Sequence, residues 1–397
     1  RAAPPPPPPP PLPGRSVVLL ERGVLGGEGR RRSRRGRRGG GGGGRGDKLG
    51  ASDRAGGIPE REVPDIEMRD LDIVRVLGTG TFGIVKLVQH KQSGTVLALK
   101  CLQKTKIAAM KQQKNIVNEK QILWRCQHPL ILDLVKTFQD QDQLYMLTEL
   151  IQGGELWSYI YDRVHLIPHT SVGGFRVSTA RFYAACVVLC LEYVHGLGVA
   201  YRDLKPENLL LDNQGFLKMI DFGFAKYIPF KKGNQIQTKS FTLCGTPDYL
   251  APELVRSKGH DKSVDYWALG CLVYELICGQ TPFQDNYQPE VFKKIVNSKK
   301  SLHIPRGFDS DAADLVKKLL APNPSFRLGN LNGGARDIMN HAWFDGKTDW
   351  DGILGKTVQA PYVPSIANPL DTSCFDAIPD DETVPRYIGS QQPFERF

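Results

Sequence analysis

The sequence has no CxxC pair, although it contains eight cysteines among its 397 residues. Cysteines scattered in this way are typical of reduced, mostly buried thiols, and they argue against a disulfide framework or a zinc site. Cys186 and Cys190 would lie on one face of a helix, which predicts that they belong to the core. The sequence also has no uninterrupted apolar run of about 18 residues, the length that a membrane span needs, and nothing in it resembles a signal peptide. We therefore expect the protein in the cytosol or the nucleus.

Beyond its first 58 residues the chain carries almost no net charge. Residues 1–58 hold thirteen Lys and Arg against four Asp and Glu, which is +9 of the total net charge of +10. The same segment contains eight consecutive prolines and six consecutive glycines. It cannot bury enough apolar surface to offset the entropy lost on ordering, so we predict a disordered extension over residues 1–66. Because the chain starts at Arg1 instead of Met, we also expect it to be a fragment.

The arginines of this extension indicate an additional role. Residues 34–46 (RRGRRGGGGGGRG) resemble an RGG segment, which would contact nucleic-acid phosphates electrostatically. The segment lacks the interleaved aromatic residues on which bases stack. We therefore expect at most a weak contact of this extension with nucleic acid, in addition to whatever function the rest of the chain has.

The most informative stretch is residues 201–208 (YRDLKPEN), which is followed by an apolar run at 216–220 and by Asp-Phe-Gly at 221–223. An apolar strand that ends in a carboxylate, beside a loop that carries Asp, Lys and Asn, can hold a divalent cation and phosphate oxygens. Oxygen ligands of this kind suit magnesium. The two strings, in this order, resemble the catalytic loop and the metal-binding loop of the eukaryotic protein kinases.

The resemblance implies a role for each polar residue of these loops. Asp203 would accept the proton of a substrate hydroxyl group, and Lys205 would steady the moving phosphoryl group. Asn208 and Asp221 would hold magnesium ions, so the implied cofactors are ATP and Mg²⁺. Because all of these residues are present, an inactive kinase-like scaffold is a poor alternative.

A glycine-rich stretch, residues 78–83 (GTGTFG), precedes these loops. Its GxGxxG spacing is weak by itself, because dinucleotide-binding folds share it. The next residues, 84–88, are β-branched and alternating, so they predict a second strand instead of the helix of a dinucleotide fold. A hairpin that folds over a triphosphate is therefore favoured over an ordinary hairpin. The resemblance implies nucleotide contacts by Gly78, Thr79, Gly80, Thr81, Phe82 and Gly83.

The same resemblance assigns an ion pair. Lys100, at the end of a predicted strand at 95–100, would bind the α and β phosphates of the nucleotide. Glu119, on the polar helix that follows, would pair with it. Each residue alone would more simply be a surface charge, and only their order after the glycine stretch favours the pair.

The apolar run at 144–151 predicts a buried strand that enters a hinge. The resemblance implies that backbone groups of Glu149 and Ile151 receive adenine and that Thr148 lies behind it as a small gatekeeper, with a deep back pocket. Further nucleotide contacts are expected from Val85, Ala98, Glu155, Leu210 and Phe375.

Residues 242–253 (TLCGTPDYLAPE) resemble the activation segment of the kinases, with Thr242 at the phosphorylated position. Phosphate there would bring nearly two negative charges, which Arg202 is placed to neutralise. Asn115 stands where close relatives usually have a histidine that also touches this phosphate, so we expect a weaker link to the Glu119 helix. Folding roles are implied for Asp265, Trp267, Gly270 and the pair Glu253–Arg327.

The resemblance also implies a site for a basic peptide. Glu155, Glu207 and Glu275 would attract arginines two and three residues before the target Ser or Thr. An alternative for Glu275 is a buried helix carboxylate that is paired internally. The residue after the target would enter an apolar pocket formed by Leu243, Pro247 and Leu250. Ser33 follows three arginines and would then be a slow cis-substrate or weak pseudosubstrate, although a solvated basic tail is the simpler alternative.

The end of the chain resembles the C-terminal tail of the AGC group of serine/threonine kinases. Residues 360–376 are rich in proline and are not expected to be helical; they would wrap the small lobe and bring Phe375 near the adenine. Residues 394–397 (FERF) would fill a pocket beside the Glu119 helix. Tyr201, where most kinases have His, agrees with this group.

Within the AGC group, the stretches GGELW, RFYAACVV, DFGFAK, GHDKSVDYWALG and NPSFRLGNLNGG look most like the cGMP-dependent protein kinases. The final FERF looks more like the catalytic subunit of the cAMP-dependent kinases, which is the alternative. No segment before residue 71 is long enough for a cyclic-nucleotide-binding domain of roughly 100 residues. We therefore expect such a regulatory domain outside this chain or on another subunit.

The implied fold is α+β, the bilobal protein kinase fold with a small β-rich N-lobe and a larger helical C-lobe. We expect the kinase domain at residues 67–344, with the change of lobe at about residue 150, and an AGC tail at 345–397. Residues 165–177 (HLIPHTSVGGFRV) are polar and broken by Gly and Pro, and they predict a surface insertion.

Overall fold

The computed structural model describes residues 63–228, 239–242, 244–380 and 383–397. Nearly all of the predicted disordered extension lies outside these ranges, and so do Ser33, the RGG-like stretch and Leu243. The carbonyl oxygen of Pro64 accepts a hydrogen bond from Lys136 Nζ at 3.0 Å, and Ile66 packs against an apolar cluster of the small lobe. Contacts with the small lobe thus start before residue 67, where the sequence placed the domain boundary.

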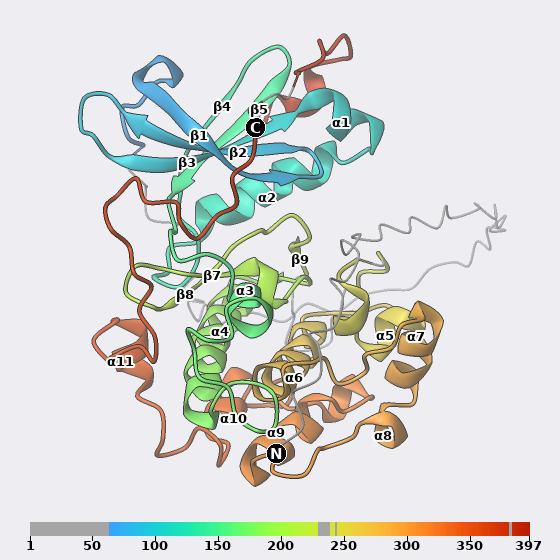
Figure 1. Ribbon diagram of the computed structural model, residues 1–397. Coiled ribbons are helices and arrows are strands. Elements are labelled where there is room, and N and C mark those ends of the chain that lie inside the picture. The colour runs from blue at the N-terminus through green and yellow to red at the C-terminus, as the bar shows by residue number, and fades with distance from the viewer. Residues whose placement is uncertain (1–62, 229–238, 243, 381–382) are drawn as a thin grey trace, which may run out of the picture.

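The small lobe is a five-stranded antiparallel sheet with two helices (Figure 1). The strands have the spatial order β1-β2-β3-β5-β4. Their register places Ala98 opposite Thr148 and Lys100 opposite Met146, so β3 and β5 present neighbouring residues to the space below the sheet. The elements are β1 (Leu71–Gly80), β2 (Gly83–His90), β3 (Val96–Gln103), α1 (Lys104–Ala109), α2 (Gln113–Arg125), β4 (Leu134–Gln139) and β5 (Gln143–Glu149).

The glycine stretch forms the turn between β1 and β2, so the predicted second strand is confirmed and a dinucleotide fold is excluded. Gly83 is required by a close approach of two strands. A Cβ at this position would lie 1.9 Å from the backbone oxygen of Cys101 on β3. Any larger residue would push the hairpin away from β3.

The large lobe is helical and is built around α4 (Val177–Gly196) and α6 (Ser263–Cys278) (Figure 1). Every residue of α6 is buried. By length and composition α4 could cross a membrane, but 67% of that stretch is buried inside the protein, which is typical of the core helix of a large domain. Cys186 and Cys190 lie buried on α4, as predicted. A Cβ on Gly270 would lie 2.9 Å from Leu319 Cβ, so this glycine lets α6 pack closely against α9 (Ser310–Leu319).

The other elements of the large lobe are shorter. The helices are α3 (Leu156–Tyr161), α5 (Pro252–Val255), α7 (Gln288–Val296), α8 (Ser298–Ser301), α10 (Ala335–Met339) and α11 (Trp350–Leu354). The strands, which pair in two small sheets, are β6 (Val199–Ala200), β7 (Leu209–Leu211), β8 (Leu217–Met219) and β9 (Lys226–Tyr227).

Two buried carboxylates hold α6 and α5 in place. Asp265 accepts hydrogen bonds from the backbone N–H groups of Tyr201 and Arg202 at 2.9 and 2.7 Å, so it orients the start of the 201–208 loop. Glu253 pairs with the fully buried Arg327 through two bonds of 2.7 and 2.9 Å. A buried charge needs such a partner, because losing it would leave an uncompensated ion in the core.

Residues 165–177 are not simply a surface insertion, so that prediction was wrong in part. Phe175 is fully buried, and Ile167 is 1% exposed. The backbone N–H of Phe175 donates to the carbonyl oxygen of Leu276 near the end of α6 at 2.7 Å. The segment therefore packs into the core of the large lobe while its polar residues face outward.

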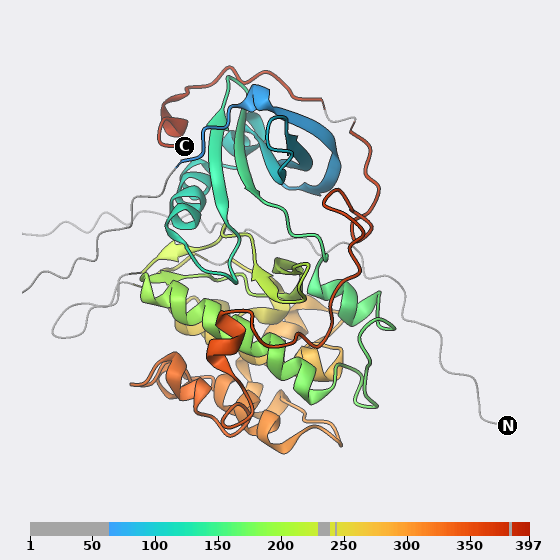
Figure 2. The same ribbon diagram turned by 90° about the vertical axis from the view of Figure 1, so that its left-hand side faces the viewer.

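The C-terminal segment runs from α11 on the large lobe, past the junction of the lobes, and over the small lobe (Figures 1 and 2). Lys356 Nζ lies 2.6 Å from Asp212 Oδ2 where the segment leaves the large lobe. Arg75 on β1 donates to Thr372 Oγ1 at 2.7 Å where it reaches the small lobe. Residues 360–376 contain no helix, as expected.

The last aromatic residues occupy a pocket on the small lobe. Phe394 is fully buried, and Phe397 is 8% exposed. Lys104 Nζ lies 5.3 Å from the centre of the Phe394 ring, and Lys120 Nζ on α2 donates to the backbone oxygen of Phe397 at 2.7 Å. Residues 394–397 therefore pack beside α2, as the sequence indicated.

Candidate active site

A cleft of about 470 Å³ lies between the two lobes. Its walls come from the glycine hairpin, β3, α2, the hinge after β5 and the 201–208 loop. Every residue that the sequence analysis assigned to catalysis, nucleotide binding or metal binding lines this cleft, including Phe375 from the C-terminal tail. The structure brings these side chains together, and their individual roles stay predictions.

The side of the cleft next to the hinge is apolar. One apolar cluster lines this side of the cleft, and Leu77, Val85, Ala98, Leu150 and Phe375 are among its members. At the back, Thr148 is 7% exposed, and its Oγ1 donates to the carbonyl oxygen of Glu149 at 3.1 Å. An apolar slot with backbone groups along one edge suits a flat heteroaromatic ring, because ligand pockets pair apolar walls with a few fixed polar groups.

The phosphate side of the cleft contains an ion pair. Lys100 Nζ on β3 lies 2.7 Å from Glu119 Oε1 on α2. Burial alone would lower the pKa of Lys100, but the carboxylates of Glu119 and Asp221 outweigh it and raise that pKa. The ammonium group is therefore charged at neutral pH and available to phosphate oxygens.

The 201–208 loop holds a carboxylate in a polar network. Asp203 is 4% exposed, and its Oδ2 accepts a hydrogen bond from Asn208 Nδ2 at 2.8 Å and lies 3.3 Å from Lys205 Nζ. Burial raises the pKa of Asp203 against the opposing effect of Lys205, and the Asp221 carboxylate adds to the rise. A carboxylate with a raised pKa is a better proton acceptor.

The backbone of this region is strained at two positions. Arg202 and Asp221 have φ values of 70° and 52°, in the left-handed region that side chains seldom adopt. Strain of this kind costs about 1–3 kcal/mol per residue and gathers at functional sites. It sets the direction of the Arg202 side chain in the 201–208 loop and of the Asp221 side chain after β8.

The oxygen atoms near Asp203 fit magnesium. Asp203 Oδ1 is buried and has no hydrogen-bond partner within the described ranges, and Asn208 and Asp221 line the same cleft. The described part of the chain contains no group of three or more His, Cys, Asp or Glu that could enclose a metal ion. Magnesium is usually held by one or two carboxylates together with substrate phosphates, so this sparse set of ligands is suitable.

Two carboxylates of the predicted peptide site, Glu155 and Glu207, also line the cleft. Loss of solvent around the Glu155 carboxyl group, followed by the negative charge of Glu207, raises the pKa of Glu155 to about 7. Asp376 and Asp162 add to this rise. The mouth of the cleft is thus acidic and attracts cations.

The third carboxylate, Glu275, is different. It lies on α6 with no exposed surface, and it accepts hydrogen bonds from the hydroxyl groups of Tyr161 and Tyr249. This environment matches the alternative in which Glu275 is buried and paired internally. Tyr161 was not named from the sequence, because nothing near it in the chain points to a partner on α6.

The predicted apolar pocket for the next substrate residue is described in part. Leu250 is 5% exposed and lines a small cavity next to Asp203, and Pro247 opens the short turn before it. Leu243 lies outside the described residues.

Comparison with known proteins agrees with this geometry. Residues 71–344 match the family model described as "Protein kinase domain". The chain belongs to the protein kinase family. The prediction that the chain is an AGC-type serine/threonine kinase is confirmed.

The relatives of this kinase include both cyclic-nucleotide-dependent classes. It is 42% identical over 317 residues to the cAMP-dependent protein kinase catalytic subunit of Dictyostelium discoideum, covering 80% of this chain and 46% of the relative. It is 41% identical over 328 residues to cGMP-dependent protein kinase, isozyme 1, of Drosophila melanogaster, covering 82% and 41%. It is also 41% identical over 325 residues to a cAMP-dependent protein kinase, catalytic subunit-like, of Caenorhabditis elegans, covering 82% and 76%. The chain spans less than half the length of the first two relatives, and these identities do not separate the two classes.

The activation segment of this kinase contains a cluster that the sequence analysis missed. Arg202 Nη1 donates to Ser240 Oγ at 3.1 Å and to His260 Nε2 at 3.3 Å, while Lys226 Nζ donates to the same Ser240 oxygen at 3.2 Å. Burial, and then the charge of Arg202, lower the pKa of His260 to about 4, so the imidazole is neutral. Thr242 is exposed two residues further along the chain. Arg202 and Lys226 thus both contact the residue two positions before the predicted phosphorylation position.

Asn115 does not take part in this cluster. It donates to Gln112 on the preceding turn, and within the described ranges no hydrogen bond joins it to Thr242. The weaker link predicted between the activation segment and α2 stays a prediction.

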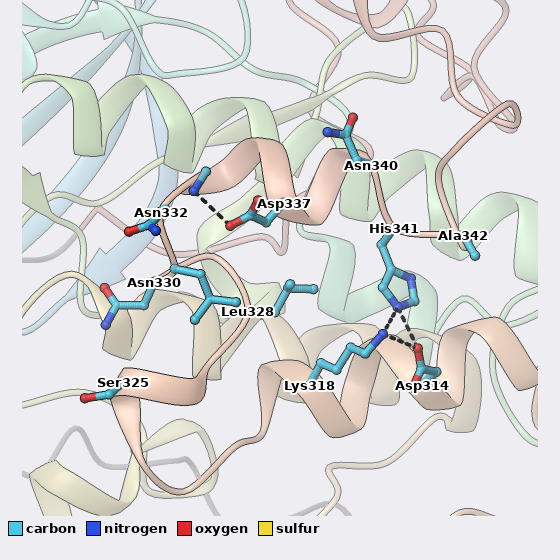
Figure 3. Close-up of a pocket in the computed structure, with 12 residues that line it drawn as sticks. Asp314, Lys318, Ser325, Leu328, Asn330, Asn332, Asp337, Asn340, His341 and Ala342 are labelled. Atoms are coloured by element: carbon cyan, nitrogen blue, oxygen red, sulfur yellow. Dashed lines mark hydrogen bonds and ion pairs between the residues drawn. The ribbon is translucent and has the colours of Figure 1, made fainter.

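A larger hollow of about 820 Å³ on the large lobe shares no residue with the cleft (Figure 3). Lys318 and His341 both point to Asp314, at 2.6 and 2.9 Å from its Oδ2. These charged groups satisfy one another, and none of the predicted site residues lies there. The residues predicted for the chemistry lie in the cleft between the lobes instead.

Proposed function

We propose that this chain transfers the γ-phosphoryl group of ATP to serine or threonine hydroxyl groups in basic sequence contexts. One observation carries the proposal: Asp203, Asn208, Asp221 and the Lys100–Glu119 pair converge in one cleft whose mouth is acidic. This set provides a proton acceptor, oxygen ligands and a fixed cation within one site.

The chain's own residues would act on alignment and charge. Asp203, with its raised pKa, would hold the substrate hydroxyl group and take its proton. Lys205, held beside Asp203 Oδ2, would stabilise negative charge that develops on the transferred group. Lys100 would orient the α and β phosphates. Bound ATP with Mg²⁺ would supply the phosphoryl group and neutralise its oxygens.

The acidic mouth of the cleft supports basic peptides as the proposed substrates. Glu155 and Glu207 lie near each other, and the negative charge of Glu207 raises the cost of ionising Glu155. An arginine side chain placed between them would relieve that repulsion and form charge-assisted hydrogen bonds. Peptides with arginines two and three residues before the target are therefore the proposed substrates.

We also propose control by a cyclic nucleotide through a domain outside this chain. The stretches quoted in the sequence analysis favour cGMP, and cAMP is the alternative. A cytosolic or nuclear location is part of this proposal.

The proposal is tested with the purified chain, ATP and Mg²⁺, and a serine peptide with two arginines before the target. Radioactive phosphate should enter the peptide serine, and the Asp203→Asn variant should not support this transfer. Incorporation at the same rate by Asp203→Asn, or none by the wild type after phosphorylation of Thr242, would contradict the proposal. Extending the chain to its full reading frame and adding cGMP or cAMP then separates the two classes.

A further inference from the structure

The carboxylate of Glu149, the last residue of β5, is held by two groups from other parts of the chain. Its Oε1 lies 2.5 Å from Lys218 Nζ on β8 and accepts a hydrogen bond from the backbone N–H of Asp133 at 2.8 Å. The backbone N–H of Glu149 in turn donates to the carbonyl oxygen of Asp133 at 3.1 Å. The end of β5, where the hinge begins, is therefore fixed through both its side chain and its main chain.

Lys218 lies in the centre of β8, opposite Leu210 of β7. Leu210 lines the cleft, whereas Lys218 does not, so the Lys218 side chain lies outside the site for a ligand. Three residues further along the chain, β8 leads to Asp221, which lines the cleft. The Lys218–Glu149 pair therefore joins the hinge to the strand that leads to a predicted metal ligand.

This ion pair is largely shielded from water. The side chain of Lys218 is 10% exposed, and that of Glu149 is 30% exposed. Charges that have little contact with water are weakly screened, so such a pair keeps its geometry better than an ion pair on the surface. Removing the Glu149 carboxylate would leave the Lys218 ammonium group buried without its charged partner.

The position of the hinge matters for the base of a bound nucleotide. Backbone groups of Glu149 and Ile151 are the predicted partners of adenine, and both residues line the cleft. Hydrogen bonds weaken steeply as their geometry departs from the optimum. The phosphates are assigned to Lys100, whose ion pair with Glu119 is separate from the pair at the hinge. Loss of the hinge pair should therefore weaken binding of the base and spare binding of the phosphates.

We propose that Lys218 is a positioning residue for nucleotide binding: through the Glu149 carboxylate it fixes the hinge relative to the strand that leads to Asp221. The base and the metal site are thereby kept at a constant separation, although Lys218 itself touches neither. This inference rests on the proposed use of ATP in the cleft and deepens it.

The test measures dissociation constants by calorimetry for two probes, adenosine and inorganic triphosphate with Mg²⁺, which occupy different sides of the cleft. Lys218→Met should raise the dissociation constant of adenosine by about fivefold, which corresponds to about 1 kcal/mol, and change that of triphosphate by less than about twofold. In peptide phosphorylation the KM for ATP should rise by a similar factor, while kcat and the KM for the peptide change by less than about twofold. A side chain that only supported the fold would not separate adenosine from triphosphate.

Three further variants test the route through Glu149. Lys218→Arg keeps the charge and should keep the wild-type constants. Glu149→Gln should raise the adenosine constant as much as Lys218→Met does, and the double variant should raise it no further, because both substitutions remove the same contact. Lys347→Met is the control, since its Nζ lies 2.8 Å from Asp311 Oδ2 on the large lobe and neither residue lines the cleft. Its constants should equal those of the wild type.

Unchanged adenosine binding in a folded Lys218→Met variant would overturn the inference, and so would an equal loss of adenosine and triphosphate binding. Peptide phosphorylation by the wild type would then still support the proposed function. Thermal unfolding establishes that each variant is folded, and if Lys218→Met does not fold, Glu149→Gln decides alone. A wild-type protein that bound no adenosine would refute ATP as the ligand of this cleft and the inference with it.

Discussion

Lys100 Nζ on β3 lies 2.7 Å from Glu119 Oε1 on α2, so the sheet and the helix of the small lobe are joined inside the cleft. The Glu119 side chain is almost fully buried, while that of Lys100 keeps part of its surface open toward the cleft. Removing one partner of a buried pair leaves the other charge uncompensated. The position of α2 and the phosphate side of the cleft therefore depend on the same contact.

Lys100→Met and Asp203→Asn should each lower kcat by well over tenfold while the protein stays folded, because both residues act on charge and alignment in the transition state. Steady-state kinetics and thermal unfolding of the purified variants would measure this. Lys86→Met is the control, since Lys86 on β2 pairs with Asp380 and does not line the cleft. A variant that kept more than about a tenth of the activity, a loss of only about 1.4 kcal/mol in the barrier, would not fit the assigned role.

Thr242→Ala should lower activity, because Arg202 and Lys226 would lack the phosphate charge that balances them. The fully phosphorylated wild type should exceed both the variant and the phosphatase-treated wild type in kcat/KM. Mass spectrometry of each preparation would establish whether Thr242 carries phosphate. Equal activity of the phosphorylated and unphosphorylated forms would show that this position does not control the enzyme.

Thr148→Met should weaken inhibitors that place an aryl group behind the adenine, while the KM for ATP changes little. The longer side chain would fill the space that Thr148, at the back of the apolar slot, leaves open. Inhibition constants for a pair of compounds with and without the aryl group would measure the effect. If both compounds inhibited both enzymes equally, another residue would close the back of the slot.

The KM for a peptide with two arginines should rise as the pH falls through about 7, because Glu155, whose pKa is raised to about 7, becomes neutral and stops attracting the guanidinium groups. The peptide without arginine is the control and should show a flat KM over this range. Glu155→Gln should have the high KM at every pH. A wild-type KM for the two-arginine peptide that did not change with pH would remove Glu155 from the peptide site.

Phe394→Ala should destabilise the protein by about 3–5 kcal/mol, because it empties a fully buried aromatic position beside α2. The packing of α2 would loosen with it, so activity should fall as well. Urea unfolding gives the stability change. Ile388→Ala is a matched control in the same segment, since Ile388 is 92% exposed and its loss should change stability by less than about 0.5 kcal/mol. Equal effects of the two substitutions would mean that the segment does not pack as the structure shows.

The catalytic and nucleotide-binding residues could be predicted because they stand in short strings. Residues 78–83, 201–208 and 221–223 each place their polar groups within a few residues of one another, so local backbone geometry and residue type already indicate the chemistry. The alternating residues after residue 83 predicted a strand, and this distinguished the hairpin from the glycine loop of a dinucleotide fold. That prediction was possible because alternation is a local property of the chain. The sequence thus determined the family, the two lobes and the members of the cleft.

The tertiary structure alone decided which distant groups meet. Phe175 became a core residue because its backbone reaches Leu276 at the end of α6. Glu275 is buried on α6 and accepts a hydrogen bond from Tyr161, which no local pattern connects to it. Contacts of this kind depend on the packing of whole helices, and packing is set by the sum of many apolar contacts rather than by any short string.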